Sequence, residues 1–504
     1  MRKFFFVCFL FLFFSCQSFH HDSSTLIVGV ESFPENLDPR LATDALSAKI
    51  SALVYPGLFV MGTNMRPMPS VAESYKFISD TVLSVHIKKN LVFHNGKHLT
   101  VQDVLKTYQS VIDPHLHSPL AGTLEVIDRI ESVSEDEIKI ILKRPFAPIL
   151  TVLTLGILPE SVAAQGFLPI GCGPYQIEEV IDRQKIVLKR FENYRLGEKP
   201  KTNRLVFKTF WDDTVRVLEF LKGRIDLMQN AAPLTLIPAI EKGTKNNKPN
   251  VLEEAGINFS YLGFNLKDPI LSHSLVRKAI AHAINRDDII RYKLMGKASP
   301  ATSLLFPGHW AFNASLEPFD YNPEKAKKLL DEAGYPDPEG EVPRFKLVYK
   351  TSAKKDRVEL ALLIADYLRA VGIEVEVSSY EWGTFFRDIK NGNFQMFSLT
   401  WVGVTEPDIY YYAFHSSQIP PIGANRIFYY NPTLDLFLEQ GRTTLDENKR
   451  REIYGQVQKI IYDDFVYVPL WYENNVVAVQ ENVVGYTLRP DAGFQNLVNT
   501  FVAE

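Results

Sequence analysis

The chain has 504 residues, of which 46% are hydrophobic and 23% are charged, and it carries a formal net charge of −4. These proportions are those of an ordinary soluble globular protein. The slightly acidic balance gives no reason to expect binding to nucleic acid or to an anionic membrane surface. A chain of this length is expected to form about two to four domains.

The amino-terminal end has the pattern of an export signal. Met1-Arg2-Lys3 carries positive charge, and an apolar run from Phe4 to Phe14 follows it. That run is shorter than the roughly 20 apolar residues that a membrane-spanning helix needs. The pattern therefore predicts a cleaved signal peptide over residues 1–16 and a polar tether over residues 17–25. We expect a protein that functions outside the cytoplasm, in the periplasm or at the cell surface.

Phe13-Phe14-Ser15-Cys16 resembles the lipobox of bacterial lipoproteins, although Phe13 stands where Leu is usual. The resemblance implies a lipid anchor on Cys16. An ordinary signal peptide, with Cys16 incidental, is the alternative. Apart from Cys8 within the signal, the sequence has one further cysteine, Cys172. A mature protein lipidated at Cys16 would form no internal disulfide, so its core alone would have to stabilise it.

Strand-like and helix-like segments alternate along the chain, which predicts a mixed α/β fold. Apolar or alternating runs predict strands at residues 25–30 and 82–87 and a hairpin at residues 175–191. Thr100, with Asp103 three residues later, forms a capping pair that opens a helix.

Two further helices are expected in the second half of the chain. Residues 276–284 place small and aliphatic side chains at helical spacing, and Asn285 with Asp288 recaps the chain for another helix. Asn322-Pro323-Glu324 supplies a cap, a proline at the first helical position and an acid in the first turn, and Gly334 is the predicted stop.

The sequence contains no metalloprotease His-Glu-x-x-His, no Gly-x-Ser-x-Gly elbow and no phosphate-binding Gly-x-x-x-x-Gly-Lys. His94 and His98 have the spacing of helical metal ligands, but the turn signal Asn95-Gly96 between them argues against a helix. Cys172 has no basic neighbour in sequence and is expected to be a small buried filler. We therefore expect no catalytic residue, no metal site and no cofactor.

Ordered segments along the chain resemble the extracytoplasmic solute-binding proteins of ABC transporters, in family 5, which includes oligopeptide, dipeptide and nickel binders. The segments are Asn36-Leu37-Asp38-Pro39, Val54-Tyr55-Pro56-Gly57-Leu58, Phe93-His94-Asn95-Gly96-Lys97-His98-Leu99-Thr100-Val101-Gln102-Asp103-Val104, Gly171-Cys172-Gly173-Pro174-Tyr175, Gly223-Arg224-Ile225-Asp226, Gly263-Phe264-Asn265, Val276-Arg277-Lys278-Ala279-Ile280, Tyr321-Asn322-Pro323-Glu324-Lys325-Ala326 with Gly334-Tyr335, and Val468-Pro469-Leu470.

The resemblance implies an α/β, periplasmic-binding-protein-like fold of two lobes, the type II three-domain version, with a ligand cleft between the lobes. The first lobe would combine residues 26–54, 167–256 and 470–504 with an inserted domain of residues 55–166. The second lobe would be residues 257–469. Closing the two lobes would bury the ligand and present a composite face to a membrane permease.

The resemblance also implies which residues bind the ligand. Peptide-binding members hold the ligand backbone through short extended stretches, which match Thr43-Asp44-Ala45 and Trp401-Val402-Gly403-Val404 here. Tyr261, Phe264 and Asn265 are the candidates where the chain crosses between lobes. Backbone pairing of this kind would give affinity for peptides of many sequences. Core packing is the alternative interpretation of Trp401.

Val404 departs from the peptide-binding pattern. Peptide-binding relatives commonly place an Asp just after the Trp-x-Gly stretch to pair with the free amino group of the peptide. Leaving a buried ammonium unpaired costs about 3 to 5 kcal/mol, or roughly 10² to 10³-fold or more in affinity. Either Asp44, Glu406 or Asp408 supplies the charge, or the ligand has no free amine in that place.

The predicted function is the substrate-binding component of an ABC importer, a monomer that captures oligopeptides by lobe closure and delivers them to the permease subunits. The protein is not expected to be an enzyme or to bind nucleic acid. Another small ligand, such as a metal chelate, haem, glutathione or an oligosaccharide, is an alternative that suits Val404. A peptidase and a lipoprotein adhesin or chaperone are alternatives from other classes.

Overall fold

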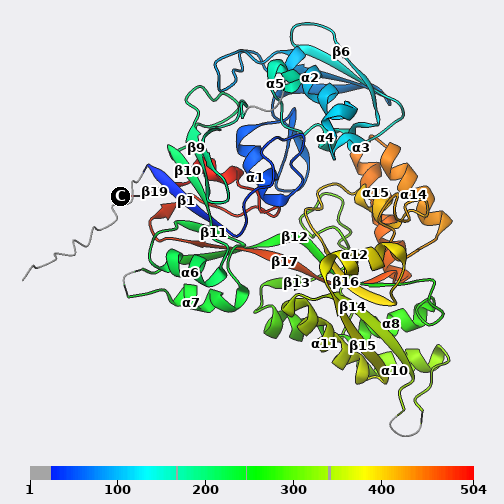
Figure 1. Ribbon diagram of the computed structural model, residues 1–504. Coiled ribbons are helices and arrows are strands. Elements are labelled where there is room, and N and C mark those ends of the chain that lie inside the picture. Colours follow the sequence, from blue (N-terminus) through cyan, green and yellow to red (C-terminus); the bar gives the residue numbers. More distant parts are fainter. Residues whose placement is uncertain (1–23, 166–168, 246, 339–341, 504) are drawn as a thin grey trace, which may run out of the picture.

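A computed structural model of the protein describes residues 24–165, 169–245, 247–338 and 342–503. The predicted signal peptide with Cys16, and the predicted tether up to residue 23, lie outside the described residues. Figure 1 shows three bodies: a first lobe at the left, an inserted domain above it to the right, and a second lobe below. Within the described ranges, no helix combines the length and the apolar character needed to cross a membrane.

The first lobe is built on parallel strands β1 and β10, which pair from Thr25 with Arg204 to Val30 with Thr209. Its elements are β1 (Thr25–Val30), α1 (Ala45–Val54), β8 (Tyr175–Ile181), β9 (Lys185–Arg190), β10 (Arg204–Thr209), α6 (Asp213–Leu221), β11 (Leu227–Gln229), α7 (Ile237–Lys242), β18 (Val483–Val484) and β19 (Phe501–Val502). The carboxy-terminal end of the chain therefore returns to the lobe in which the described chain begins.

The inserted domain is a small antiparallel sheet, β4-β5-β7-β6, with short helices against it. Its elements are β2 (Phe59–Met61), β3 (Pro67–Pro69), β4 (Ala72–Ser79), β5 (Val82–Ile87), α2 (Val101–Ile112), α3 (Ala121–Leu124), β6 (Ile127–Ser132), β7 (Glu137–Leu142), α4 (Ile149–Val152) and α5 (Glu160–Gln165).

The second lobe combines a parallel pair, β14 with β15, and a larger set of helices. Its elements are α8 (Ser274–Ala283), α9 (Arg286–Asp288), β13 (Ala298–Pro300), α10 (Pro323–Glu332), β14 (Phe345–Ser352), α11 (Lys355–Arg369), β15 (Ile373–Tyr380), α12 (Trp382–Asn391), β16 (Met396–Trp401), α13 (Ile409–Phe414), α14 (Pro432–Thr443) and α15 (Glu447–Asp463).

Two long antiparallel strands, β12 (Asn250–Phe264) and β17 (Tyr467–Val479), connect the lobes. They lie in the middle of one continuous sheet with the order β15-β14-β16-β12-β17-β11-β1-β10-β9-β8. The register of their pairing is irregular between Glu254 and Asn258 and again between Ser260 and Tyr261. Figure 1 shows this pair running from the first lobe into the second.

Each body has its own hydrophobic core. The cores contain Leu26, Ile50 and Tyr175 in the first lobe, Phe93, Tyr108 and Ile140 in the inserted domain, and Ile280, Leu330, Phe397 and Tyr467 in the second lobe. Leu158 and Val162 pack in the first-lobe core, whereas Cys172 packs in the core of the inserted domain. The domain boundaries taken from the resemblance stay a prediction, and these three residues lie on the other side of them.

The elements expected from local sequence signals are found in the fold. Residues 25–30 and 82–87 are strands, and residues 175–191 form the antiparallel pair β8 and β9. Thr100 and Asp103 form the expected capping box of α2. Asn322 caps α10, with Pro323 as its first residue, and the chain leaves the helix at Gly334 with a positive φ. These signals act over three or four residues, which is why sequence alone was sufficient.

The turn at Asn36-Leu37-Asp38-Pro39 is part of the scaffold. Asp38 and Arg40 form a buried ion pair with an N–O distance of 2.7 Å. Arg40 also donates to the Ser110 hydroxyl and to the Ala163 carbonyl, both at 3.1 Å. Because Ser110 and Ala163 lie on helices of the inserted domain, this pair fixes that domain on the first lobe.

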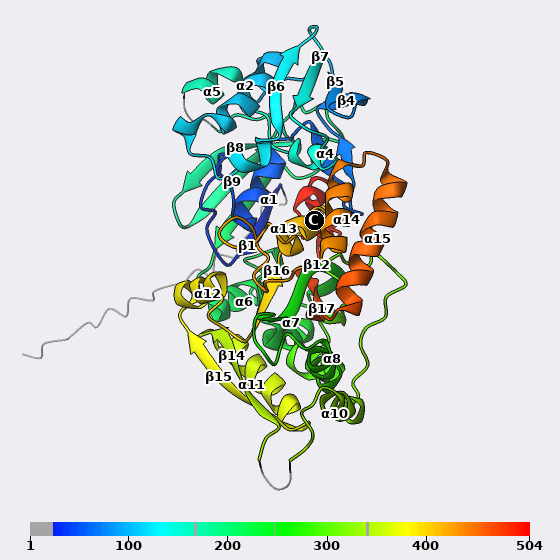
Figure 2. The ribbon, with the colours of Figure 1, turned by 90° about the vertical axis from the view of Figure 1, so that its right-hand side faces the viewer.

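Helices α14 and α15 of the second lobe lie beside the inserted domain (Figure 2). The backbone N–H of Ala147 donates to the Arg442 carbonyl at 2.7 Å, and the Thr151 hydroxyl donates to Glu406 at 3.1 Å. Arg66 and Glu447 form an exposed ion pair. These contacts join the two bodies along one side and leave a cleft open beside them.

We expect Gly256→Ala to destabilise the protein. Gly256 lies in the irregular part of β12, where a Cβ atom would lie 2.2 Å from the backbone oxygen of Glu473. The strands would have to separate locally, which should lower the free energy of unfolding by about 1 to 3 kcal/mol in urea denaturation. Gly455→Ala in α15 is the control, because no atom lies within 4 Å of its Cβ position. Equal stabilities of the two variants would contradict the prediction.

Candidate functional site

A cleft of about 1240 Å³ lies between the inserted domain and the second lobe. On one side its walls come from α3, α4 and the loops beside them, including the segment after β7. On the other side they come from the end of β16, the segment after it, α13 and α14. The lining residues used below are Glu125, Lys143, Arg144, Phe146, Thr151, Trp401, Val402, Gly403, Val404, Glu406, Asp408, Tyr411, Tyr412, Gln418, Ile422 and Arg442.

A second cavity, of about 790 Å³, adjoins the cleft on the side of the first lobe. The two share Thr123, Thr151 and Val152 in their walls. Helix α1 contributes Tyr55 and several small residues to this cavity, and the carboxy-terminal return contributes Asp491. The two cavities are therefore adjacent: the first lobe borders one, the second lobe borders the other, and the inserted domain borders both.

The predicted stretch from Trp401 to Val404 lies on the second-lobe wall of the cleft. Trp401 is the last residue of β16 and pairs with Phe259 of β12. Gly403 has φ +69° and donates its backbone N–H to the Asn258 side chain at 3.3 Å. Val402 is 64% exposed, whereas Val404 is buried in the core. The turn at Gly403 therefore presents the stretch to the cleft and returns the chain to the lobe.

One edge of β16 is unpaired towards the end of the strand. On the β12 side the pairing is complete from Phe264–Met396 to Phe259–Trp401. On the β14 side it covers Met396 and Phe397, whose partners are Tyr349 and Lys350. From Ser398 onwards, no strand among the described residues pairs with that edge.

The acids on the second-lobe wall are already paired. Glu406 accepts a hydrogen bond from Arg450 at 2.6 Å, and Asp408 lies 2.9 Å from the Arg442 guanidinium. Burial raises the pKa of Asp408 to about 7; the positive charge of Arg442 opposes this rise, and the negative charge of Glu406 adds to it. Arg442 in turn stacks on Tyr411, 3.8 Å from the ring centroid.

Thr43, Asp44 and Ala45 lie at the start of α1, near the first-lobe cavity but outside its lining. Asp44 is the N-cap of the helix and accepts a hydrogen bond from the backbone N–H of Ser47 at 2.9 Å. Ala42 and Ala48 on either side of this stretch do line the cavity. The Asp44 carboxylate therefore has a structural role at the helix terminus.

Of the three residues predicted at the lobe crossing, Tyr261 lies nearest to the cleft. It lines a small space that also touches Trp401 and Arg426. Phe264 is fully buried in the second-lobe core. Asn265 donates to the backbone oxygens of Gly392 and Phe394, at 3.1 and 2.9 Å. Phe264 and Asn265 thus belong to the scaffold, and neither lines a cavity described above.

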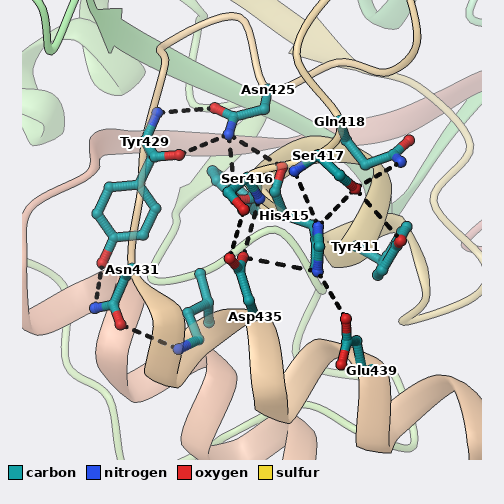
Figure 3. A network of polar contacts seen from close by, with 12 residues as sticks. Tyr411, His415, Ser416, Ser417, Gln418, Asn425, Tyr429, Asn431, Asp435 and Glu439 are labelled. Carbon is teal, nitrogen blue, oxygen red and sulfur yellow. Dashed lines mark hydrogen bonds and ion pairs between the residues drawn. The ribbon is translucent and has the colours of Figure 1, made fainter.

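A polar network around His415 and Asn425 lies in the second lobe, next to the cleft wall (Figure 3). Asn425 is fully buried; it donates to the carbonyls of Phe414, His415 and Tyr429 and accepts the Tyr429 N–H. The His415 ring stacks on Tyr411 with centroids 4.3 Å apart. No sequence pattern indicated this network, because its residues come together only when the loop between α13 and α14 folds back on itself.

His94 and Cys172 occupy buried structural positions. His94 accepts the backbone N–H of Gly171 at 3.1 Å and contacts the Gly173 oxygen at 3.2 Å. Burial lowers the pKa of His94 to about 4 and raises the pKa of Cys172 to about 12. The prediction that Cys172 is a buried filler is confirmed.

Comparison with known proteins agrees with this architecture. The oligopeptide-binding protein AppA of Bacillus subtilis is 27% identical over 507 residues, covering 95% of this chain and 92% of the relative. The dipeptide-binding protein of Escherichia coli K12 is 27% identical over 505 residues, covering 93% of each chain.

Solved structures show the same fold. The structure of Bacillus subtilis AppA in complex with a nonapeptide matches with a TM-score of 0.76, covering 95% of this chain and 99% of that one. The ABC transporter substrate-binding protein CtaP of Listeria monocytogenes matches with a TM-score of 0.84 and 28% identity, with the same coverage. The family model of bacterial extracellular solute-binding proteins, family 5, matches residues 66–420. The chain therefore belongs to the bacterial extracellular solute-binding proteins of family 5.

Proposed function

We propose that the protein is the substrate-binding component of an ABC importer, which captures oligopeptides outside the cytoplasm and delivers them to the permease. The unpaired edge of β16 carries this proposal. An extended peptide can add to such an edge through main-chain hydrogen bonds, which do not depend on the peptide sequence. Trp401, the last residue of that edge, lines the cleft of about 1240 Å³, and the relatives include a protein solved with a nonapeptide.

Closure of the lobes would complete the site. Thr43, Asp44 and Ala45 at the start of α1 lie beside the first-lobe cavity and are our candidates for contact with the ligand after closure. Trp401 to Gly403 and Tyr261 would contact it from the second lobe. A receptor of this kind releases its ligand unchanged, so we assign no catalytic residue.

Lipid attachment at Cys16 would keep the receptor at the membrane surface. A tethered receptor samples the permease at a higher effective concentration than a free one. A single lipid chain binds a membrane only weakly, so contact with the permease would supplement it.

On the second-lobe wall, both cleft-lining acids among the described residues are already in ion pairs with arginines. Val404 occupies the position at which peptide-binding relatives commonly have an Asp. Asp44 is engaged at the N-terminus of α1, and Glu406 and Asp408 are paired with Arg450 and Arg442. Recruiting one of these acids would break an existing pair in a partly buried setting, which is costly. The wall around Trp401 therefore favours ligands whose free amine, if present, lies elsewhere.

Isothermal titration of the mature protein with mixed tripeptides to pentapeptides tests the proposal. We expect saturable binding and, in small-angle scattering, a smaller radius of gyration when ligand is bound. Absence of binding to every peptide would refute oligopeptide capture.

Trp401→Ala should weaken peptide binding by about 10- to 100-fold, because the side chain supplies an aromatic surface to the cleft. The measurement is isothermal titration, with thermal unfolding as a check on the fold. Tyr292→Ala is the matched control, since Tyr292 is a 67% exposed aromatic of the same lobe that lines none of the cavities described here. If Trp401→Ala lowered stability but left affinity unchanged, Trp401 would be a packing residue.

Asp408 should make stability depend on pH. Its pKa is raised to about 7 in the folded protein, so it binds a proton that the unfolded chain releases near pH 4. The free energy of unfolding of wild type, relative to that of Asp408→Asn, is therefore highest below about pH 4, where Asp408 is protonated in both the folded and the unfolded protein. This difference falls by up to about 4 kcal/mol as the pH rises to about 7. Urea denaturation of both proteins across this range measures the difference. A difference independent of pH would show that Arg442 keeps Asp408 ionised.

A further inference from the structure

Arg426 holds a partly buried positive charge directly beside Trp401. Its guanidinium lies over the Trp401 ring, 5.0 Å from the centroid, and over the Phe386 ring of α12 at 5.2 Å. It also lines the small space that Trp401 and Tyr261 share. Burial raises the pKa of the Tyr261 hydroxyl, and the positive charge of Arg426 opposes that rise. The guanidinium therefore lies against two aromatic faces, next to a phenol. Arg426 does not line the cleft itself, but Trp401, on which it stacks, does.

No carboxylate pairs with Arg426 in the part of the chain that the structure describes. The other arginines on this side of the second lobe differ in that respect. Arg442 contacts Asp408 at 2.9 Å, and Arg450 contacts Glu406 at 2.6 Å. Two aromatic faces can hold a guanidinium in place, but they do not neutralise it. Among the described residues, Arg426 is thus an uncompensated cation beside Trp401 in the second lobe.

The backbone that carries Arg426 is fixed before any ligand arrives. Asn425, the preceding residue, makes the buried hydrogen bonds to Phe414, His415 and Tyr429 that Figure 3 shows. The backbone N–H of Ala424 donates to the Tyr412 carbonyl at 2.9 Å. A positively charged group whose backbone is held in this way loses little freedom on binding, which favours a specific ionic contact.

The surface around Arg426 is apolar and exposed, which suits an enclosed ligand rather than bulk water. Trp382 is 53% exposed, Tyr412 44%, Val402 64% and Ile422 74%. Val402, Tyr412 and Ile422 all line the cleft. Covering these side chains with a ligand would also lower the local dielectric around the guanidinium and strengthen its attraction for an anion.

We propose that Arg426 is a specificity determinant that binds a carboxylate of the ligand. The group can be the carboxy terminus of a peptide or an acidic side chain, since both present the same planar pair of oxygens to a guanidinium. This inference rests on the proposed peptide function and deepens it. The second lobe of this protein selects its ligand by a negative charge at Arg426 and leaves the position of Val404 without an ionic contact.

The test uses one pentapeptide, Ala-Tyr-Ala-Tyr-Ala, in three forms: with both termini free, with an acetylated amino terminus, and with an amidated carboxy terminus. A fourth probe is the amidated peptide with its central Ala replaced by Glu. Dissociation constants come from isothermal titration of the mature protein. We expect acetylation to change affinity less than threefold, whereas amidation weakens binding by about 10- to 100-fold, the range for a hydrogen bond to a charged group.

The variant Arg426→Gln should bind the free and amidated forms equally, at the affinity of wild type for the amidated form. Arg426→Lys keeps the charge without the planar fork and should retain part of the discrimination; it also serves if the glutamine variant fails to fold. Arg387→Gln is the charge control: Arg387 is exposed on α12, next to Phe386, and does not stack on Trp401. It should bind all four probes as wild type does.

The outcomes separate the possible sources of failure. Recovery of affinity by the Glu-containing amide identifies an acidic side chain as an acceptable group; no recovery assigns the site to the carboxy terminus. Peptide binding that ignores both amidation and Arg426→Gln overturns the role of Arg426 and leaves the receptor function intact. Failure of all four probes to bind wild-type protein overturns both proposals.

Discussion

The pairing of β12 with β17 is the constraint on which the rest of the structure depends. These strands connect the two lobes by a backbone ladder whose register runs from Asn250–Val479 to Gly263–Tyr467. Most of β17 is buried, whereas in β12 Asn250 and Leu252 to Ala255 are exposed and burial begins at Gly256. The irregular register begins at the same place, and strands bend most easily where the ladder is interrupted. A ladder that is anchored at both ends and weak in the middle allows the lobes to approach each other as rigid bodies.

The hydrogen bonds and charges around the cleft indicate that its two walls have different roles in ligand binding. On the second-lobe wall, Asn425 fixes the loop that carries Arg426, and the β12 ladder fixes Trp401. The opposite wall belongs to the inserted domain, which the buried Asp38–Arg40 pair fixes on the first lobe. The second lobe thus offers a preformed binding surface, and the remaining bodies supply a cover. Preformed contacts reduce the entropy lost when a flexible ligand binds.

Much of the fold could be predicted from the sequence, because its signals are local. The capping box at Thr100 and the proline-opened helix at Asn322 each depend on residues a few positions apart. The family-like segments located the stretch after Trp401 correctly on the cleft wall. Phe264 and Asn265 stay predictions as site residues; in the structure, Phe264 is buried in the core and Asn265 donates to the backbone oxygens of Gly392 and Phe394. A residue of a family motif can be required for packing or for a backbone hydrogen bond as well as for ligand binding.

Arg426 escaped sequence analysis for a complementary reason. Its partners are Tyr261, Phe386 and Trp401, which come from β12, α12 and β16, and no local pattern brings these elements together. The absence of a carboxylate partner is equally invisible in a sequence that contains 59 acidic residues. Val404 was visible, and it indicated that the usual ionic contact is missing. Val404, where an acid is missing, and Arg426, which has no carboxylate partner among the described residues, both lie near Trp401 in the second lobe. With Arg426 in the role that we propose, this site would recognise a negative charge where peptide-binding relatives commonly recognise a positive one, and the ligand chain would still bind along the edge of β16.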